Sequence, residues 1–200
     1  MNPRATERSF TMTTYTRRSF LTGLTLVGGG IVLAACSTGN TNGMNHSGNN
    51  GAAYDQNFID GMVPHHQAAV EMAKVAQTKA EHAELKTLAS AIIAAQDGEI
   101  AQMKGWRKAW YGSDQIAPGM GGHQMGGMDT DLAAFGNAQP FDRAFIDAML
   151  PHHESAVMMA KEAQTKAEHQ EIKDLAGRII ASQQQEINQM KGWRTQWYPG

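Results

Sequence analysis

The segment FIDGMVPHH, residues 58–66, returns later in the chain as FIDAMLPHH, residues 145–153. These segments open a longer repeat: residues 58–111 align without a gap to residues 145–198, with 37 of 54 positions identical. Each copy contains two helical patterns separated by a short polar stretch. Because one helical hairpin cannot bury its apolar face alone, the repeat predicts an all-α four-helix bundle built from two duplicated hairpins.

The composition supports a modest domain with a real core. The chain has 200 residues, of which 42% are hydrophobic, and a formal net charge of -2. Four Arg and one Glu give residues 1–35 a charge of +3, so the remainder carries -5. This mildly acidic balance gives no support to nucleic-acid binding, which requires a concentrated basic face. The single cysteine, Cys36, excludes an intrachain disulfide and a Cys-based zinc site.

The first 36 residues have the pattern of an export signal. A twin-arginine segment, TRRSFL at 16–21, precedes an apolar stretch and then LAAC at 33–36, which resembles a lipobox. Residues 1–36 are thus interpreted as a twin-arginine signal with its lipobox, which predicts cleavage immediately before Cys36 and lipidation of the Cys36 sulfur. The protein would then be exported and anchored to a membrane, on the outer side of the cytoplasmic membrane or in the periplasm. An uncleaved amphipathic or membrane-spanning start is the alternative, and Met12 offers a second start.

The remaining chain divides by composition. Residues 37–53, rich in Gly, Asn, Ser and Thr, are expected to form a flexible tether. The two repeats then occupy 54–112 and 141–200, acting as one domain. The Gly-rich linker at 113–140 carries Met and His at positions where core packing does not explain them. We interpret four of these as auxiliary metal ligands: Met120, His123, Met125 and Met128.

The first helix of each repeat has a seam at alternating steps of four and three residues. In the first copy it includes Met62, His65 and Met72. A second apolar stripe, with His66, runs beside it, so the two histidines flank one broad buried face. The second copy repeats the pattern with Met149, His152, His153 and Met159. Pro64 and Pro151 are expected to kink these helices, unless they occupy the first helical turn.

The second helix of each repeat has an apolar seam interrupted at the same register in both copies. Gln96 and Glu99 precede Met103 in the first copy, and Gln183 and Glu186 precede Met190 in the second. An ionised carboxylate buried there is costly unless it is paired or bound to a cation. We therefore expect His65 and His152 to lie within reach of Glu99, Met103, Glu186 or Met190. A Glu–His hydrogen bond without metal is the structural alternative.

The mixture of thioether and imidazole donors indicates the metal. Thioether sulfur is soft, so such a site suits Cu(I) and by extension Ag(I), with Cu(II) as a further option. Imidazole must be neutral to bind, so affinity should weaken near a pKa of about 6.5. Methionines at helical spacing are more often core residues. The four tryptophans are expected to be structural, and His82 and His169 to be structural or solvated, with a peripheral metal site as a further alternative. The candidate ligands are Met62, His65, His66, Met72, Glu99, Met103, Met149, His152, His153, Met159, Glu186 and Met190.

The repeats resemble the ferritin-like domain-of-unknown-function family number 305, found in exported bacterial proteins, some associated with copper. The motifs that carry the resemblance are FIDxMxPHH followed by MAK, and IIxxQxxEIxQMKxW. The family usually has a proline after the His of the turn, where this chain has Ala83 and Gln170. The resemblance implies a role in copper binding or tolerance. The ligands it implies are Met62, His65, His66 and Met103, with Met149, His152, His153 and Met190.

Three functions follow as hypotheses. The first is a lipid-anchored copper chaperone or sequestering protein, with a protein partner for metal transfer. The second is a di-iron oxidase, which would need Glu-x-x-His pairs and further inward carboxylates; the sequence contains no Glu-x-x-His. The third is a metal-free envelope interaction module. No catalytic constellation is present, so the sequence favours a binding protein over an enzyme.

Overall fold

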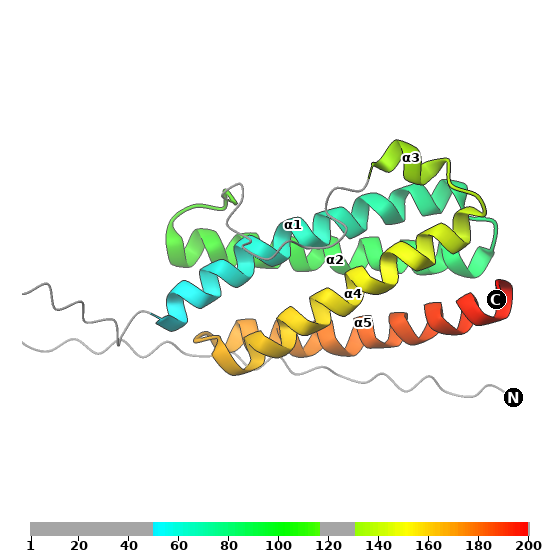
Figure 1. The fold of residues 1–200 in the computed structure, drawn as a ribbon. Helices are drawn as coiled ribbons and strands as arrows, with labels where there is room; N and C mark the ends of the chain where they lie inside the picture. Colours follow the sequence, from blue (N-terminus) through cyan, green and yellow to red (C-terminus); the bar gives the residue numbers. More distant parts are fainter. Residues whose placement is uncertain (1–49, 117–130, 200) are drawn as a thin grey trace, which may run out of the picture. The chain divides into compact units, whose positions relative to one another are not determined.

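A computed structural model describes residues 50–116 and 131–199. The predicted export signal, the lipidation site Cys36, most of the tether and the linker ligands Met120, His123, Met125 and Met128 lie outside the described residues. The helices are α1 (Asn50–Lys79), α2 (Ala83–Tyr111), α3 (Leu132–Gly136), α4 (Phe141–Lys166) and α5 (Gln170–Trp197). The predicted all-α four-helix bundle is confirmed (Figure 1).

The two hairpins meet along their first helices. α1 packs against α2, α4 packs against α5, and α1 and α4 pack against each other. Pro64 and Pro151 lie inside α1 and α4, so the alternative that they occupy a first helical turn is wrong. Within the described ranges, no helix is both long and apolar enough to cross a membrane.

Two boundaries differ from the prediction. α1 begins at Asn50, inside the segment expected to be tether, because the helix extends past the repeat toward its N-terminus. The linker contains the short helix α3, whose N-cap Asp131 accepts hydrogen bonds from the backbone N–H groups of Ala133 and Ala134, both at 3.0 Å. Phe135 of α3 contacts Phe141 of α4, with ring centroids 5.4 Å apart. One buried aromatic ring and one cap therefore order a segment that composition alone marks as loop.

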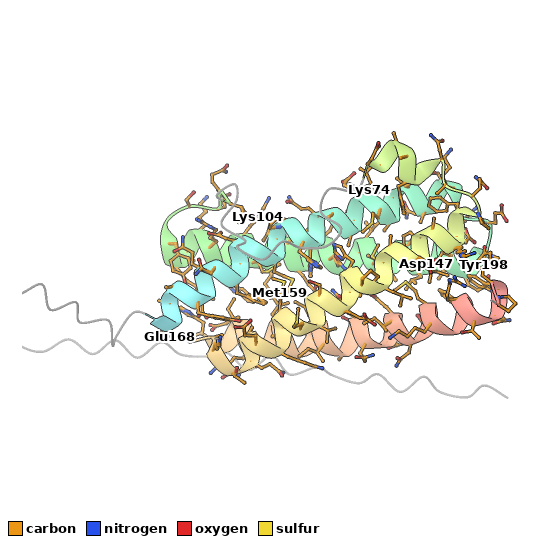
Figure 2. All side chains as sticks on the ribbon, viewed as in Figure 1. Lys74, Lys104, Asp147, Met159, Glu168 and Tyr198 are labelled. Atoms are coloured by element: carbon orange, nitrogen blue, oxygen red, sulfur yellow. The ribbon has the colours of Figure 1, made fainter. Side chains whose placement is uncertain are left out.

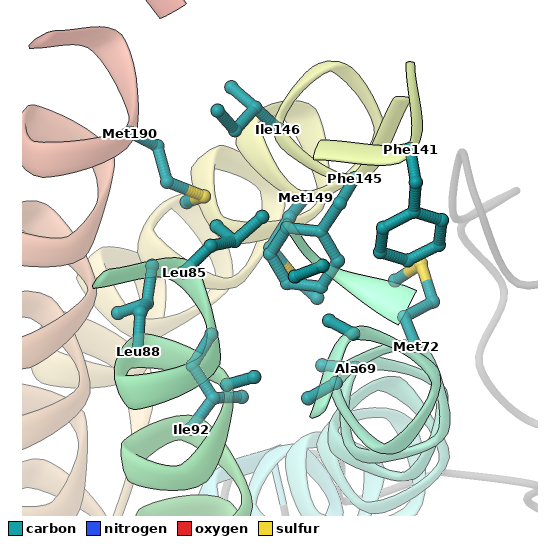
Figure 3. Close-up of a cluster of buried hydrophobic side chains, with 14 of the residues drawn as sticks. Ala69, Met72, Leu85, Leu88, Ile92, Phe141, Phe145, Ile146, Met149 and Met190 are labelled. Carbon is teal, nitrogen blue, oxygen red and sulfur yellow. The ribbon is translucent and has the colours of Figure 1, made fainter. Parts of the chain in front are cut away.

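The hydrophobic core consists of two clusters. One combines the later half of α1 and the first half of α2 with the start of α4 and the end of α5, and includes Met72, Leu85, Phe145 and Met190 (Figure 3). The other cluster combines the later half of α4 and the first half of α5 with residues from the first half of α1 and the end of α2, and includes Phe58, Met62, Met103 and Ile172. This reciprocal arrangement is an approximate twofold relation between the hairpins. It leaves the middle of the bundle for the histidines.

Buried aspartates tie each hairpin to the turn of the other. Asp142 of α4 accepts hydrogen bonds from the backbone N–H groups of Glu81 and His82, both at 2.9 Å, and pairs with His82 Nδ1 at 2.7 Å. Asp55 of α1 does the same in the other direction, pairing with His169 Nδ1 at 2.6 Å. Asp55 also binds the backbone of Glu168 and His169, at the end of the bundle where α1 begins (Figure 2). Both aspartates are fully buried.

Tryptophans stack on the histidines of these two contacts, Asp142 with the turn at 81–82 and Asp55 with the turn at 168–169, which we call the clamps. Trp197 stacks on His82 with centroids 3.8 Å apart, and Trp110 stacks on His169 at the same distance. Each of these indoles also stacks on another tryptophan one turn earlier, Trp193 and Trp106 respectively. The structural role predicted for His82, His169 and the tryptophans is therefore observed at the two ends of the bundle.

Candidate metal centre

Four histidines form a layer between the two core clusters. His65 and His66 lie on α1, His152 and His153 lie on α4, and all four are at most 1% exposed. The rings of His65 and His152 face each other across the hairpin interface, with centroids 3.8 Å apart and an interplanar angle of 40°. Successive residues of a helix point about 100° apart, so each helix turns one imidazole to the opposite hairpin and the other to its own partner helix.

The other two histidines pair with the predicted carboxylates. His66 Nε2 lies 2.7 Å from Glu99 Oε2, and His153 Nε2 lies 2.6 Å from Glu186 Oε2. The side chains of Glu99 and Glu186 are only 16% and 13% exposed. His65 and His152 make no hydrogen bond to these carboxylates, and the expectation that they lie within reach of Glu99, Met103, Glu186 or Met190 stays a prediction. Since α1 contacts both α2 and α4, only the second histidine of each pair faces the helix that carries the glutamate.

The four histidines, and the two glutamines that interrupt the apolar seams, have buried polar atoms without a hydrogen-bond partner. They are Nδ1 and Nε2 of His65 and of His152, Nδ1 of His66 and of His153, and Oε1 of Gln96 and of Gln183. Such atoms are rare in folded proteins, and each costs about 1–3 kcal/mol of stability. Gln96 and Gln183 are not among the predicted ligands, although each interrupts an apolar seam at the same register, a signal that could have identified them as candidates. The layer as a whole therefore has unused lone pairs directed into the protein interior.

Burial keeps the central imidazoles neutral. Desolvation, helped by the charges of His152, His66 and His153, lowers the pKa of His65 from 6.5 to about 2. Desolvation, together with the charges of His153 and His66, lowers the pKa of His152 to about 3. The backbone of His65 acts in the opposite direction and raises this pKa, although it makes no hydrogen bond to the His152 ring. These values lie well below the unperturbed pKa of about 6.5, so these two side chains are not protonated near pH 6.5 in the folded protein. Protons compete for their lone pairs only in strong acid.

Four of the predicted ligand methionines belong to the two core clusters on either side of the histidine layer. Met62 and Met103 belong to one core cluster, Met149 and Met190 belong to the other, and all four are fully buried. Met62 precedes His65 by one helical turn, a rise of about 4.5 Å. Their burial in the two core clusters is observed, and their role as metal ligands stays a prediction.

The structure does not bring the other two predicted methionines to the histidines. Met72 lies seven residues beyond His65, about 10 Å along the helix, and packs beside Phe141 (Figure 3). Met159 has the same spacing from His152 and is half-buried on α4 (Figure 2). Both contribute to apolar packing.

Imidazole and carboxylate donors alone do not complete a site. Among residues 50–116 and 131–199, no group of three or more His, Cys, Asp or Glu is arranged to hold a metal ion. The other buried donors are the thioethers of the two core clusters and the two glutamine oxygens. A metal in this layer would therefore depend on sulfur, which favours a soft ion.

The chain matches one protein family over most of its length. The model of the domain of unknown function DUF305 matches residues 55–194. The chain belongs to the DUF305 family. The match includes the histidine layer, both pairs of flanking methionines and the cross-hairpin aspartates.

Solved structures share this DUF305 fold. CopM in its Cu(I)-bound form is 46% identical, covers 72% of this chain and 97% of CopM, and superposes with a TM-score of 0.64. CopM in its Cu(II)-bound form is 50% identical with the same coverage and a TM-score of 0.66. A DUF305 protein from Streptomyces coelicolor is 29% identical, with 68% of this chain and 89% of that chain covered and a TM-score of 0.62. CopM has also been solved with Ag and in an apo form.

A short segment also matches a viral protein. The uncharacterized protein L153 of Acanthamoeba polyphaga mimivirus is 43% identical over 49 residues, which is 24% of this chain and 32% of the viral protein. The chain therefore aligns with about a third of that relative.

Proposed function

We propose that this DUF305 protein binds copper, preferentially as Cu(I), in the histidine layer between its hairpins. The observation that carries the proposal is the pair His65 and His152, buried face to face with four ring nitrogens that have no hydrogen-bond partner. A neutral imidazole with a free lone pair is a metal ligand. The likeness to CopM, solved with Cu(I), Cu(II) and Ag, supports the same class of metal.

The proposed ligand set combines both hairpins. His65 and His152 would supply the central nitrogen donors, and Met62, Met103, Met149 and Met190, buried in the adjoining core clusters, would supply thioether donors. His66 and His153 have one free nitrogen each and are held at the other by Glu99 and Glu186. Carboxylates that orient a ligand histidine in this way are common around metal sites. The sulfur content favours Cu(I) and Ag(I) over Cu(II).

The role that fits this chemistry is copper sequestration, transfer or tolerance outside the cytoplasm. We propose that the protein is exported by its twin-arginine signal and anchored through lipid at Cys36, with Met120, His123, Met125 and Met128 as auxiliary ligands. Transfer would require a protein partner that accepts the metal. We propose binding in place of catalysis, because the donor set is poor in the oxygen ligands that di-iron chemistry requires.

A metal-free polar network is the second candidate, and the two His–Glu pairs favour it. Hydrogen bonds at 2.7 Å and 2.6 Å satisfy one nitrogen each of His66 and His153. The network nevertheless leaves His65 and His152 without any partner. A buried network maintained for structure alone would satisfy its members, because half-satisfied networks are less stable than an apolar core.

The two candidates are separated by one titration. Wild type and the double variant His65→Leu with His152→Leu are titrated with Cu(I), without oxygen, against a competing chelator. We expect the variant to lose affinity by about 100-fold or more, since two nitrogen donors are removed. A matched control, His82→Gln with His169→Gln, removes two imidazoles from the ends of the bundle and should retain wild-type affinity. Equal affinity in wild type and the Leu variant would favour the metal-free network.

A further inference from the structure

A cleft between α2 and α5 reaches the edge of the histidine layer on one side of the bundle. It has a volume of about 450 Å³, and its lining includes Leu88 and Ala91 of α2 with Gln185, Glu186 and Gln189 of α5. Glu186 is also the carboxylate that binds His153 Nε2 at 2.6 Å. Nδ1 of His153 has no partner. A single side chain therefore separates the cleft from an unsatisfied, fully buried imidazole.

The equivalent position in the other half is occupied differently. The repeat offset of 87 residues relates Glu186 to Glu99, Gln189 to Gln102 and Ala91 to Arg178. Arg178 of α5 extends to α2, where its Nη2 donates a hydrogen bond to Gln102 Oε1 at 2.8 Å. Where one side of the bundle has the methyl group of Ala91, the other has a guanidinium that bridges two helices.

The two glutamates themselves are nearly equal in exposure, 16% for Glu99 and 13% for Glu186. The difference between the two sides therefore lies in what stands beside each carboxylate. A guanidinium carries a permanent positive charge, so it opposes the approach of a cation through both repulsion and bulk. The open cleft has carboxylates and amides in its lining and no basic side chain.

From this asymmetry we infer that copper enters and leaves the histidine layer through the α2–α5 cleft beside Glu186, and that Arg178 closes the equivalent path beside Glu99. This inference rests on the proposed copper binding. It assigns unequal roles to two repeats that are identical at 37 of 54 positions. Ala91 and Arg178 determine which side of the bundle admits copper, but they are not ligands. They therefore change the rate at which copper enters and leaves, and leave the equilibrium affinity for copper unchanged.

The test measures how fast Cu(I) leaves the loaded protein in a large excess of bicinchoninate, under conditions in which the rate no longer depends on chelator concentration. Ala91→Arg is expected to slow release by about tenfold or more, the scale on which local charge alters the passage of ions. Because entry and exit follow the same path, the affinity should equal that of wild type. Ala91 is exposed on α2, so the substitution does not disturb the core.

Two further variants make the result specific. Ala94→Arg places the same charge on the exposed surface of α2 but outside the cleft lining, and should release Cu(I) at the wild-type rate. Ala91→Arg combined with Arg178→Ala opens the path beside Glu99 and should restore the wild-type rate. An Ala91→Arg variant that binds and releases Cu(I) as wild type does would overturn the inference while copper binding stands. Failure of wild type to bind Cu(I) would overturn the proposed function itself.

Discussion

At the residue scale, the unusual feature is a pair of imidazoles kept in the core without hydrogen bonds. His65 and His152 are each 1% exposed and lack partners at all four ring nitrogens. A leucine in their place would remove the desolvation cost of these nitrogens and retain most of the packing. The pair is therefore expected to lower the stability of the metal-free protein.

The stability of substituted proteins tests this interpretation. His65→Leu with His152→Leu should raise the free energy of unfolding of the metal-free protein by about 1–3 kcal/mol, because unsatisfied polar atoms are removed. His66→Leu with His153→Leu should lower it by a similar amount, because Glu99 and Glu186 lose their partners. The free energy of unfolding is measured by urea denaturation for four proteins: wild type, the two Leu double variants, and His82→Gln with His169→Gln. Equal destabilisation by both Leu pairs would contradict the account.

The same two residues predict a pH dependence. Their folded pKa values, about 2 for His65 and about 3 for His152, lie below the value near 6.5 of the unfolded chain. Above about pH 6.5 both states are neutral at these residues and the contribution is flat. As the pH falls below that value, only the unfolded chain takes up the protons, so the metal-free protein loses stability until the folded pKa values are reached. The slope approaches about 1.4 kcal/mol per pH unit for each histidine.

Comparison with the Leu variant isolates this contribution, since carboxylates elsewhere also titrate. Urea unfolding at about pH 7.5 and about pH 5 should show a larger loss of stability for wild type than for His65→Leu with His152→Leu. An identical loss in the two proteins would mean that the central imidazoles are protonated in the folded state.

Sequence reasoning identified these histidines but did not show which of them binds the glutamates. The seam pattern placed His65 and His152 on a buried face, which the structure confirms. It gave no information on which neighbouring helix each imidazole faces, because a helix packed against two others has two inward directions. Gln96 and Gln183 carried a visible signal, the same polar interruption in both repeats. Their unsatisfied oxygens become evident only when the surrounding atoms are placed.

At the scale of elements, the periodicity of the sequence predicts the helical hairpins but not the contacts that close the ends of the bundle. The stripes of the repeats predicted the long helices, whereas the clamps depend on aspartates 60 or more residues from their partners in the chain. Asp142 binds the turn before α2 through Glu81 and His82. No local pattern marks such a contact. The start of α1 at Asn50 and the short helix α3 were missed for a similar reason, since tertiary packing orders segments with weak intrinsic preference.

The clamp provides a prediction about elements. Asp142→Ala should lower the free energy of unfolding by about 3 kcal/mol, because it removes a fully buried carboxylate that binds two backbone N–H groups and His82. Asp147→Ala, on the same helix, removes a carboxylate that is 46% exposed, and should cost less than about 1 kcal/mol. Thermal or urea denaturation distinguishes the two. Similar losses for both variants would show that the clamp does not hold the hairpins together.

At the scale of the whole molecule, duplication explains both the fold and the position of the layer. Two copies of one hairpin, related by an approximate twofold, bring the same residue of each copy to the interface, and here that residue is a histidine. The repeat in the sequence was sufficient to predict the bundle. Whether the copies form one site or two was not predictable, because the alignment of repeats does not give the distance between them.

The contact between His65 and His152 predicts one shared central site. If the two rings serve one ion, His65→Leu alone and His152→Leu alone should each reduce Cu(I) affinity nearly as much as the double substitution, since loss of one donor disrupts the common site. Native mass spectrometry should then show no high-affinity ion in either single variant. Two independent sites would instead leave each single variant with half of the tightly bound copper.

The most direct test of the central claim is to locate the metal. A crystal structure of the protein loaded with one equivalent of Ag(I) would give an anomalous signal that belongs to the ion alone. The account predicts a peak in the layer between α1 and α4, within bonding distance of a ring nitrogen of His65 or His152 and of at least one flanking methionine sulfur. A peak found only elsewhere, with both central imidazoles unliganded, would contradict it.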